Sequence, residues 1–177
     1  MSFSKYPDLQ SILEIPLLSR TRRNHGLEHA TLHVLTEKFP GKSLAGHSDA
    51  GGFWLLGDLP TEEVQAAVGE ALTRLKNGER GLAVHPNCGT NLAVAGLLAA
   101  LASMFGFWGA GKRWQDKLER FPLAATLATM ALIAAQPLGL RFQRSVTTSG
   151  EPGTLEIAEI IPTGRGQKKA HRILTRG

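Results

Sequence analysis

The chain has 177 residues, of which 42% are hydrophobic and 20% charged, and its formal net charge is +5. This length fits one compact unit, and the single cysteine, Cys88, excludes an internal disulfide. A basic chain can bind nucleic acid, but neither an aromatic platform nor a recognised DNA- or RNA-binding motif accompanies the charge, so we expect no nucleic-acid partner.

The first regular pattern covers residues 6–18, whose apolar residues follow a helical period that Pro16 interrupts. The pattern is equally compatible with a helix on a membrane surface and with a helix packed on the rest of the chain. Asp8, Glu14 and two prolines fall within the first twenty residues, where no long apolar run is present. We therefore expect no signal peptide.

Residues 22–39 are expected to form a helix that ends at residues 40–41, a Pro-Gly pair. This helix contains the motif H-x-x-E-H, made of His25, Glu28 and His29. Two imidazoles four residues apart, with a carboxylate beside them, suit a catalytic zinc site, because the carboxylate can deprotonate water at the metal. The alternative is a helix with a polar histidine face that binds no metal.

One turn after the motif comes His33, so that His25, His29 and His33 share one helical face. Residues 43–59 alternate weakly between apolar pairs and glycines, which predicts a β-hairpin with His47 and Asp49 near a solvated turn.

Residues 61–77 follow the helical period, with Thr61 as the expected N-cap and a Gly after the end. Residues 81–84 are predicted to form a short strand that delivers His85 to the site.

A second motif contains His85 and Cys88, separated by Pro86 and Asn87 and followed by Gly89. Proline and glycine predict a tight turn that aims the two side chains at one point. The alternative is a turn histidine beside a buried, inert thiol. Taken with the first motif, the pattern predicts one site.

This predicted site consists of His25, His29, His85 and Cys88, or of three of these ligands with an open position, and it would hold Zn²⁺. Four protein ligands would make the metal structural, whereas three ligands and a water would make it catalytic.

Two long segments, Gly89–Gly111 and Phe121–Leu140, contain no charged residue. As helices they would measure about 34 Å and 30 Å, and the hydrocarbon core of a bilayer is about 30 Å thick. We therefore expect a transmembrane helical hairpin, with Pro137 marking a kink or the exit of its second helix. A buried helical hairpin inside a soluble protein is the alternative.

The expected hairpin has small residues at helical spacing, which would let its two helices approach closely. These residues are Ala95, Ala99, Ser103, Ala124, Ala128 and Ala131. The connecting residues 112–120 are polar, and the aromatic residues around them, including Trp108 and Trp114, suit a membrane interface.

We expect the polar residues 1–88 to remain in the cytoplasm, because no export signal precedes them. Two spans would return the C-terminus to the same side, so we predict an inner-membrane protein with both termini cytoplasmic. Basic residues are about as frequent in the hairpin loop as in the near flanks, so the positive-inside rule does not decide the orientation.

The remaining residues predict strands over 145–148 and 154–161 around a turn at 149–153. The basic residues 164–176 form either a last strand or a frayed tail. The fold class is therefore α+β. Its parts are a cytoplasmic region over residues 1–88 that contains helices and strands, a membrane hairpin over residues 89–140, and a β-hairpin with a basic tail over residues 141–177.

The motifs H-G-x-E-H and H-P-x-C-G-T-N, over residues 25–29 and 85–91, resemble those of the YqhQ-type bacterial membrane proteins. These proteins are described as predicted metal-dependent enzymes, and the hydrophobic segment directly after the second motif adds to the resemblance. The chain departs from the inverted zincin proteases, in which a downstream glutamate is the third ligand. Glu62, Glu63 and Glu70 are candidates for that position, and their spacing does not distinguish them.

The motifs favour a membrane-embedded, zinc-dependent hydrolase, peptidase-like in its chemistry, with Glu28 as general base and its site at the cytoplasmic membrane surface. The small size favours two alternatives. One is a non-enzymatic accessory subunit or assembly factor of a larger membrane complex, with a structural metal or none. The other is an accessory protein that binds a small molecule or pigment. In every case the lipid bilayer is an expected partner.

Overall fold

A computed structural model describes residues 8–165 and 168–177 of the chain. The chain forms two compact units. The first consists of Met1–His85 and Arg144–Gly177, and the second of Pro86–Gln143. The residues before and after the expected membrane hairpin therefore belong to one unit.

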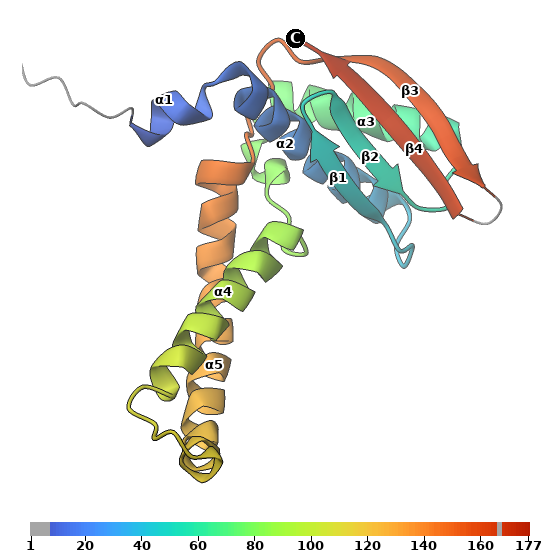
Figure 1. Cartoon of the computed structure of the whole chain (residues 1–177). Coiled ribbons are helices and arrows are strands. Elements are labelled where there is room, and N and C mark those ends of the chain that lie inside the picture. The colour runs from blue at the N-terminus through green and yellow to red at the C-terminus, as the bar shows by residue number, and fades with distance from the viewer. Residues whose placement is uncertain (1–7, 166–167) are drawn as a thin grey trace, which may run out of the picture. The chain divides into compact units, whose positions relative to one another are not determined.

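The first unit contains a four-stranded sheet with the order β1-β2-β4-β3, in which every neighbouring pair is antiparallel. The strands are β1 Ala45–Asp49, β2 Gly52–Leu56, β3 Glu156–Arg165 and β4 Lys168–Arg176. Strands β1 and β2 form the hairpin expected over residues 43–59. The basic C-terminal stretch is an inner strand and not a frayed tail, because β4 pairs with β2 on one side and with β3 on the other (Figure 1).

Helices α2 Pro16–Lys38 and α3 Thr61–Lys76 cover one face of this sheet (Figure 1). The first unit also contains α1 Leu9–Leu13, which packs against α2, and the 3₁₀ turn η1 Arg80–Ala83, which packs against α2 and α3. Alternate residues of the strands, such as Phe53, Leu55 and Ile173, face these helices and are fully or almost fully buried. Leu27 and Leu35 of α2 complete the same core. The chain is therefore α+β, as expected.

Two helix starts differ from the expectation. Helix α2 begins at Pro16 and not at residue 22, because proline at the first helical position lacks only an N–H that would have no intrahelical partner there. The N-cap of α3 is Pro60, and Thr61 is the first helical residue. The Thr61 hydroxyl instead lies 3.1 Å from Nε2 of the buried His171.

Two predicted strands are wrong. Residues 81–84 belong to the 3₁₀ turn η1 and its C-cap, and residues 145–147 lie in the π-helical turn Gln143–Thr147. Both segments offer backbone carbonyl oxygens to side chains of α2. In a strand, these carbonyl oxygens would accept hydrogen bonds from a neighbouring strand and would not be available to the side chains of α2.

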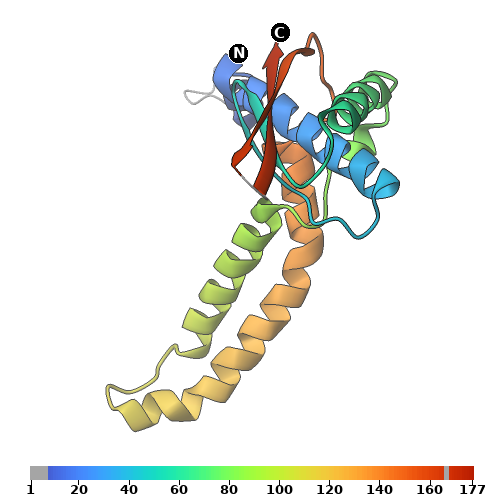
Figure 2. The same ribbon diagram turned by 90° about the vertical axis from the view of Figure 1, so that its right-hand side faces the viewer.

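The second unit is a helical hairpin of α4 Gly89–Gly106 and α5 Trp114–Phe142, which lie side by side (Figure 2). Helix α4 ends five residues before the expected Gly111. Helix α5 begins seven residues before the expected Phe121, because the Asp116 carboxylate accepts a hydrogen bond from the Arg113 backbone N–H and stabilises this helix start. Pro137 lies inside α5 and does not end it.

The two helices of the hairpin approach each other at small residues. A Cβ atom added to Gly106 would stand 2.5 Å from the Cα atom of Ala124. A Cβ atom added to Gly139 would stand 3.2 Å from the Cα atom of Asn91. The small residues expected to line this contact are all buried or half-buried.

Large apolar side chains cover the outside of the hairpin: Leu92 and Ile133 are 74% and 70% exposed. Both helices are long and apolar enough to cross a membrane, α4 being about 27 Å long. The core helix of a soluble protein would bury these side chains.

A candidate metal centre

Three histidines of α2 lie on one face of the helix, as their spacing predicts. The rings of His25 and His29 are 4.4 Å apart between centroids, and one ring nitrogen of each lies within 4.8 Å of the other. Donor atoms around a tetrahedral zinc are about 3–4 Å apart. A small rotation of the two side chains would therefore bring them to a common ion.

Backbone carbonyl groups fix the tautomers of these two histidines. Nδ1 of His25 is 3.0 Å from the carbonyl oxygen of Thr147, and Nδ1 of His29 is 2.9 Å from that of Ala83. A carbonyl oxygen can only accept, so Nδ1 carries the proton in both rings. In the neutral ring the lone pair then belongs to Nε2. Metal-binding histidines are commonly oriented in this way, by a carbonyl that accepts from the second ring nitrogen.

The carbonyl of Thr147 reaches His25 because residues 145–149 run directly over α2. The Arg22 guanidinium donates to the carbonyl oxygens of Ser145 and Thr148, and the Arg22 carbonyl accepts from the Ser149 N–H. A Cβ atom on Gly26 would collide with the Ser149 backbone. The glycine of H-G-x-E-H is thus required by a close crossing of two backbone segments.

His85 lies beside the histidines of α2. Its ring centroid is 5.7 Å from that of His29 and 4.9 Å from that of His33. Burial, together with the charges of His33 and His29, lowers the pKa of His85 to about 4, so its ring is neutral at neutral pH, as a metal ligand must be. His33 donates from Nε2 to the carbonyl oxygen of Val84, which leaves the lone pair on Nδ1. The sequence placed His33 on this face but gave it no role.

Glu28 is buried between α2 and strand β1. Its carboxylate accepts a hydrogen bond from the Ser48 hydroxyl and lies against Gly46. Burial raises the pKa of Glu28, and the hydrogen bond from Ser48 and the charges of His25 and His47 oppose this rise. Glu28 therefore lies within electrostatic reach of His25, and it is part of the contact between helix and sheet. The exposed His47 lies in β1 and not in the turn after it.

The predicted ligand Cys88 belongs to the second unit, where it is the N-cap of α4. It follows His85 by three residues, so the chain alone holds the two Cα atoms within about 10 Å. Its role as a ligand stays a prediction. Among the glutamates considered as a third ligand, Glu70 forms an ion pair with Lys38, with the Lys38 nitrogen 2.8 Å from a carboxylate oxygen.

Sequence reasoning missed the polar network that fixes the start of the motif. The fully buried Asn24 donates to the Asp49 carbonyl oxygen and accepts from the Thr175 hydroxyl. The Asp49 carboxylate in turn accepts from Arg172, which lies over the ring of Trp54. This network ties α2, the β1–β2 turn and β4 together immediately before His25. In the sequence, the only sign of this network was a polar residue, Asn24, directly before His25.

The donor set of the first unit fits a transition metal such as zinc. Imidazole nitrogens are suitable zinc ligands, and the rings of His25 and His29 are oriented by backbone groups that no change of side chain would remove. The ring of His85 lies beside that of His29, with 5.7 Å between the ring centroids. The fold and the site together define an α+β protein with an apolar helical hairpin and a histidine cluster.

A family model described as a domain of unknown function, DUF6391, matches residues 20–160, and the chain belongs to this family. An uncharacterised protein of Picosynechococcus sp. (strain ATCC 27264 / PCC 7002 / PR-6) is 36% identical over 166 residues. The alignment covers 87% of this chain and 75% of that protein. No solved structure matches the chain significantly.

Proposed function

We propose that the protein is a membrane-anchored, zinc-dependent hydrolase whose metal is held by the histidine cluster of the first unit. The observation that carries this proposal is the pair of hydrogen bonds from Nδ1 of His25 and His29 to backbone carbonyls. These bonds make Nε2 the lone-pair nitrogen of both rings, which is the nitrogen that would bind the ion. His85 is the proposed third ligand, and Cys88 the proposed fourth if the site is closed.

Each residue has a separate role in this proposal. His25, His29 and His85 hold the ion, and the carbonyls of Thr147 and Ala83 keep two of these rings in the required tautomer. When bound, zinc would polarise both water and the bond to be cleaved. Glu28, beside His25, would accept the proton of the attacking water and return it to the leaving group.

We propose a substrate close to the membrane, a peptide or a lipid-linked ester. His85 precedes the first residue of the apolar helix α4 by only four positions, so the chain itself holds the site near the start of the hairpin. A three-ligand site with an open position suits hydrolysis of an amide or ester. The proposed location is the inner membrane, with both termini in the cytoplasm. We also propose that the shared motifs reflect a distant relationship to the YqhQ-type proteins.

The test is metal analysis of the full-length protein purified in detergent. We expect one zinc per chain in the wild type and loss of that zinc in His29→Ala. His47→Ala is the matched control, because His47 is an exposed histidine of β1, and it should retain the metal. Equal zinc content in wild type and His29→Ala would overturn the proposal.

A second candidate function is a structural metal in an accessory subunit or assembly factor of a membrane complex. The favouring observation is the position of Glu28, which is 4% exposed and bonded to Ser48. Such a carboxylate can stabilise the contact of α2 with β1 without any catalytic role.

Glu28→Gln separates the two functions. In a hydrolase it should retain zinc and lower turnover of fluorogenic peptide or ester substrates by at least about 100-fold. In an accessory protein the wild type would show no turnover, and His29→Ala would lose both zinc and stability, because metal binding then contributes to folding.

A further inference from the structure

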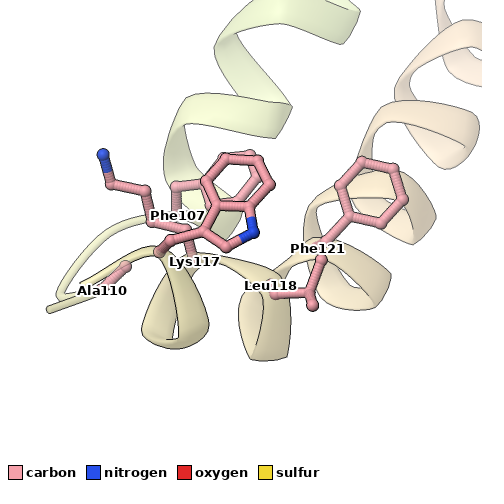
Figure 3. A pocket seen from close by; sticks show the side chains of 6 residues that line it. Phe107, Ala110, Lys117, Leu118 and Phe121 are labelled. Carbon is pink, nitrogen blue, oxygen red and sulfur yellow. The ribbon is translucent and has the colours of Figure 1, made fainter. Parts of the chain in front are cut away.

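The helical hairpin of the second unit ends in an aromatic cradle that the proposed hydrolase does not use. Its cavity of about 410 Å³ lies where α4 leads into α5 (Figure 3). The lining residues are Phe107, Ala110, Trp114, Lys117, Leu118 and Phe121. Pockets of this volume are large enough for small organic ligands.

The walls of the cradle are not covered by the rest of the hairpin. Trp114 is 75% exposed and Phe121 59% exposed. Aromatic side chains at a membrane interface present apolar rings to the carbon atoms of neighbouring lipids, so the cradle suits an occupant with an apolar part. The cradle continues the apolar outer surface of α4 and α5, which fits an occupant that also covers that surface.

The charge at this end of the hairpin indicates what the rest of the occupant carries. Residues 111–121 contain four basic residues and two acidic ones. Lys117 is the basic residue that lines the cradle, and its ammonium group extends outward from the aromatic rings (Figure 3). A second copy of the chain would bring two such basic loops together and is therefore disfavoured. An anionic headgroup would complement the charge.

We propose that the cradle binds an anionic phospholipid. The glycerol and upper acyl carbons lie against Trp114, Leu118 and Phe121, and the phosphate is held by Lys117. Tryptophan and lysine at the end of a membrane hairpin occupy the depth at which a lipid changes from acyl chain to headgroup. This lipid site is independent of the metal centre.

The experiment follows the fluorescence of Trp114 in the full-length protein, in nanodiscs. The Trp54→Phe/Trp108→Phe variant leaves Trp114 as the sole tryptophan. Brominated phosphatidylglycerol or brominated phosphatidylcholine is added in small proportion as the quencher. We expect phosphatidylglycerol to quench Trp114 at about fivefold lower proportion, the preference that one lysine near anionic lipid provides.

Lys117→Gln in this background should abolish the preference. Lys112→Gln is the matched control, because it removes the same charge from a residue five positions earlier, in the α4–α5 connection, that does not line the cavity, and it should keep most of the preference. Equal quenching by the two lipids, or equal loss in both lysine variants, would mean a diffuse surface charge and would overturn the proposal.

Native mass spectrometry of the single Lys117→Gln variant provides a second measurement that needs no tryptophan replacement. The wild type should retain one phosphatidylglycerol when released from detergent, and the variant should lose it. A dimer that forms without lipid, and that Phe121→Ala disrupts, would assign the cradle to a second copy of the chain instead. Zinc content should not change in any of these variants.

Discussion

The carboxyl group of Glu28 packs directly against Gly46, and a Cβ atom at position 46 would collide with it. The pair joins a motif residue of α2 to the glycine-rich hairpin that follows it. The hairpin therefore contributes directly to the position of the motif carboxylate.

Gly46→Ala tests this relationship. The added methyl group should displace Glu28 and break its hydrogen bond from Ser48, lowering the free energy of unfolding by about 1–3 kcal/mol, as overpacking does. Thermal unfolding followed by circular dichroism measures the change. Gly69→Ala is the matched control. It adds the same methyl group where nothing lies within 4 Å and should stabilise α3 slightly. Equal stability of the two variants would show that Glu28 does not need the space at Gly46.

The spacing of the histidines predicts which of them share an ion. His25 and His33 are eight residues apart, about 12 Å along α2, too far for one tetrahedral site. His33→Ala should therefore retain one zinc per chain, whereas His25→Ala should lose it. Titration with a chelator of known affinity distinguishes the two. Loss of zinc in His33→Ala and retention in His25→Ala would move the site toward the other end of the histidine face.

A pH effect is expected from Asp49, whose carboxylate oxygen is 2.8 Å from an Arg172 guanidinium nitrogen. The hydrogen bond from Arg172 lowers the pKa of Asp49. The ionised carboxylate therefore stabilises the fold above the pKa of the unfolded chain, near 4, and this stabilisation is lost as the pH falls through the lower folded value. Asp49→Asn should lower stability at pH 7 by no more than about 1 kcal/mol, because the pair is partly exposed.

Unfolding of wild type and Asp49→Asn should be compared at pH 7 and pH 3. The difference between them should shrink at the lower pH. A difference that grows on acidification would contradict the sign of the shift.

The hairpin makes a prediction about membrane insertion. The full-length protein should remain in the pellet after carbonate extraction, because both helices are long and apolar enough to cross a bilayer. Ile133→Arg should weaken insertion, since arginine at the centre of a span costs about 2.5–3.5 kcal/mol. Lys112→Arg introduces the same residue outside both helices and should leave membrane insertion unchanged. Release of the wild-type protein into the soluble fraction would mean that the hairpin packs elsewhere.

The sequence was sufficient where structure depends on local spacing. Residues four apart on a helix must share a face, so the neighbouring positions of His25 and His29 followed from the motif alone. Glycines between apolar pairs similarly predicted the β1–β2 hairpin.

Segments whose backbone groups bind a distant element were not predictable. Ala83 and Thr147 look like strand residues, but their carbonyl oxygens accept from His29 and His25. These bonds connect positions 54 and 122 residues apart. The hydrogen bond from Ser48 to Glu28 could not be predicted for the same reason, because the two residues come into contact only when β1 packs on α2. The proposed roles of His85 and Cys88 remain predictions.

The strand order β1-β2-β4-β3 has a consequence for how the protein is made. Strand β2 is synthesised before the apolar hairpin and its neighbour β4 after it, so one edge of β2 stays unpaired while the hairpin emerges. The Thr147 carbonyl that orients His25 also arrives only after α5. Synthesis of both helices therefore precedes closure of the sheet, and the hydrogen bond that orients His25 can form only after α5 has been made.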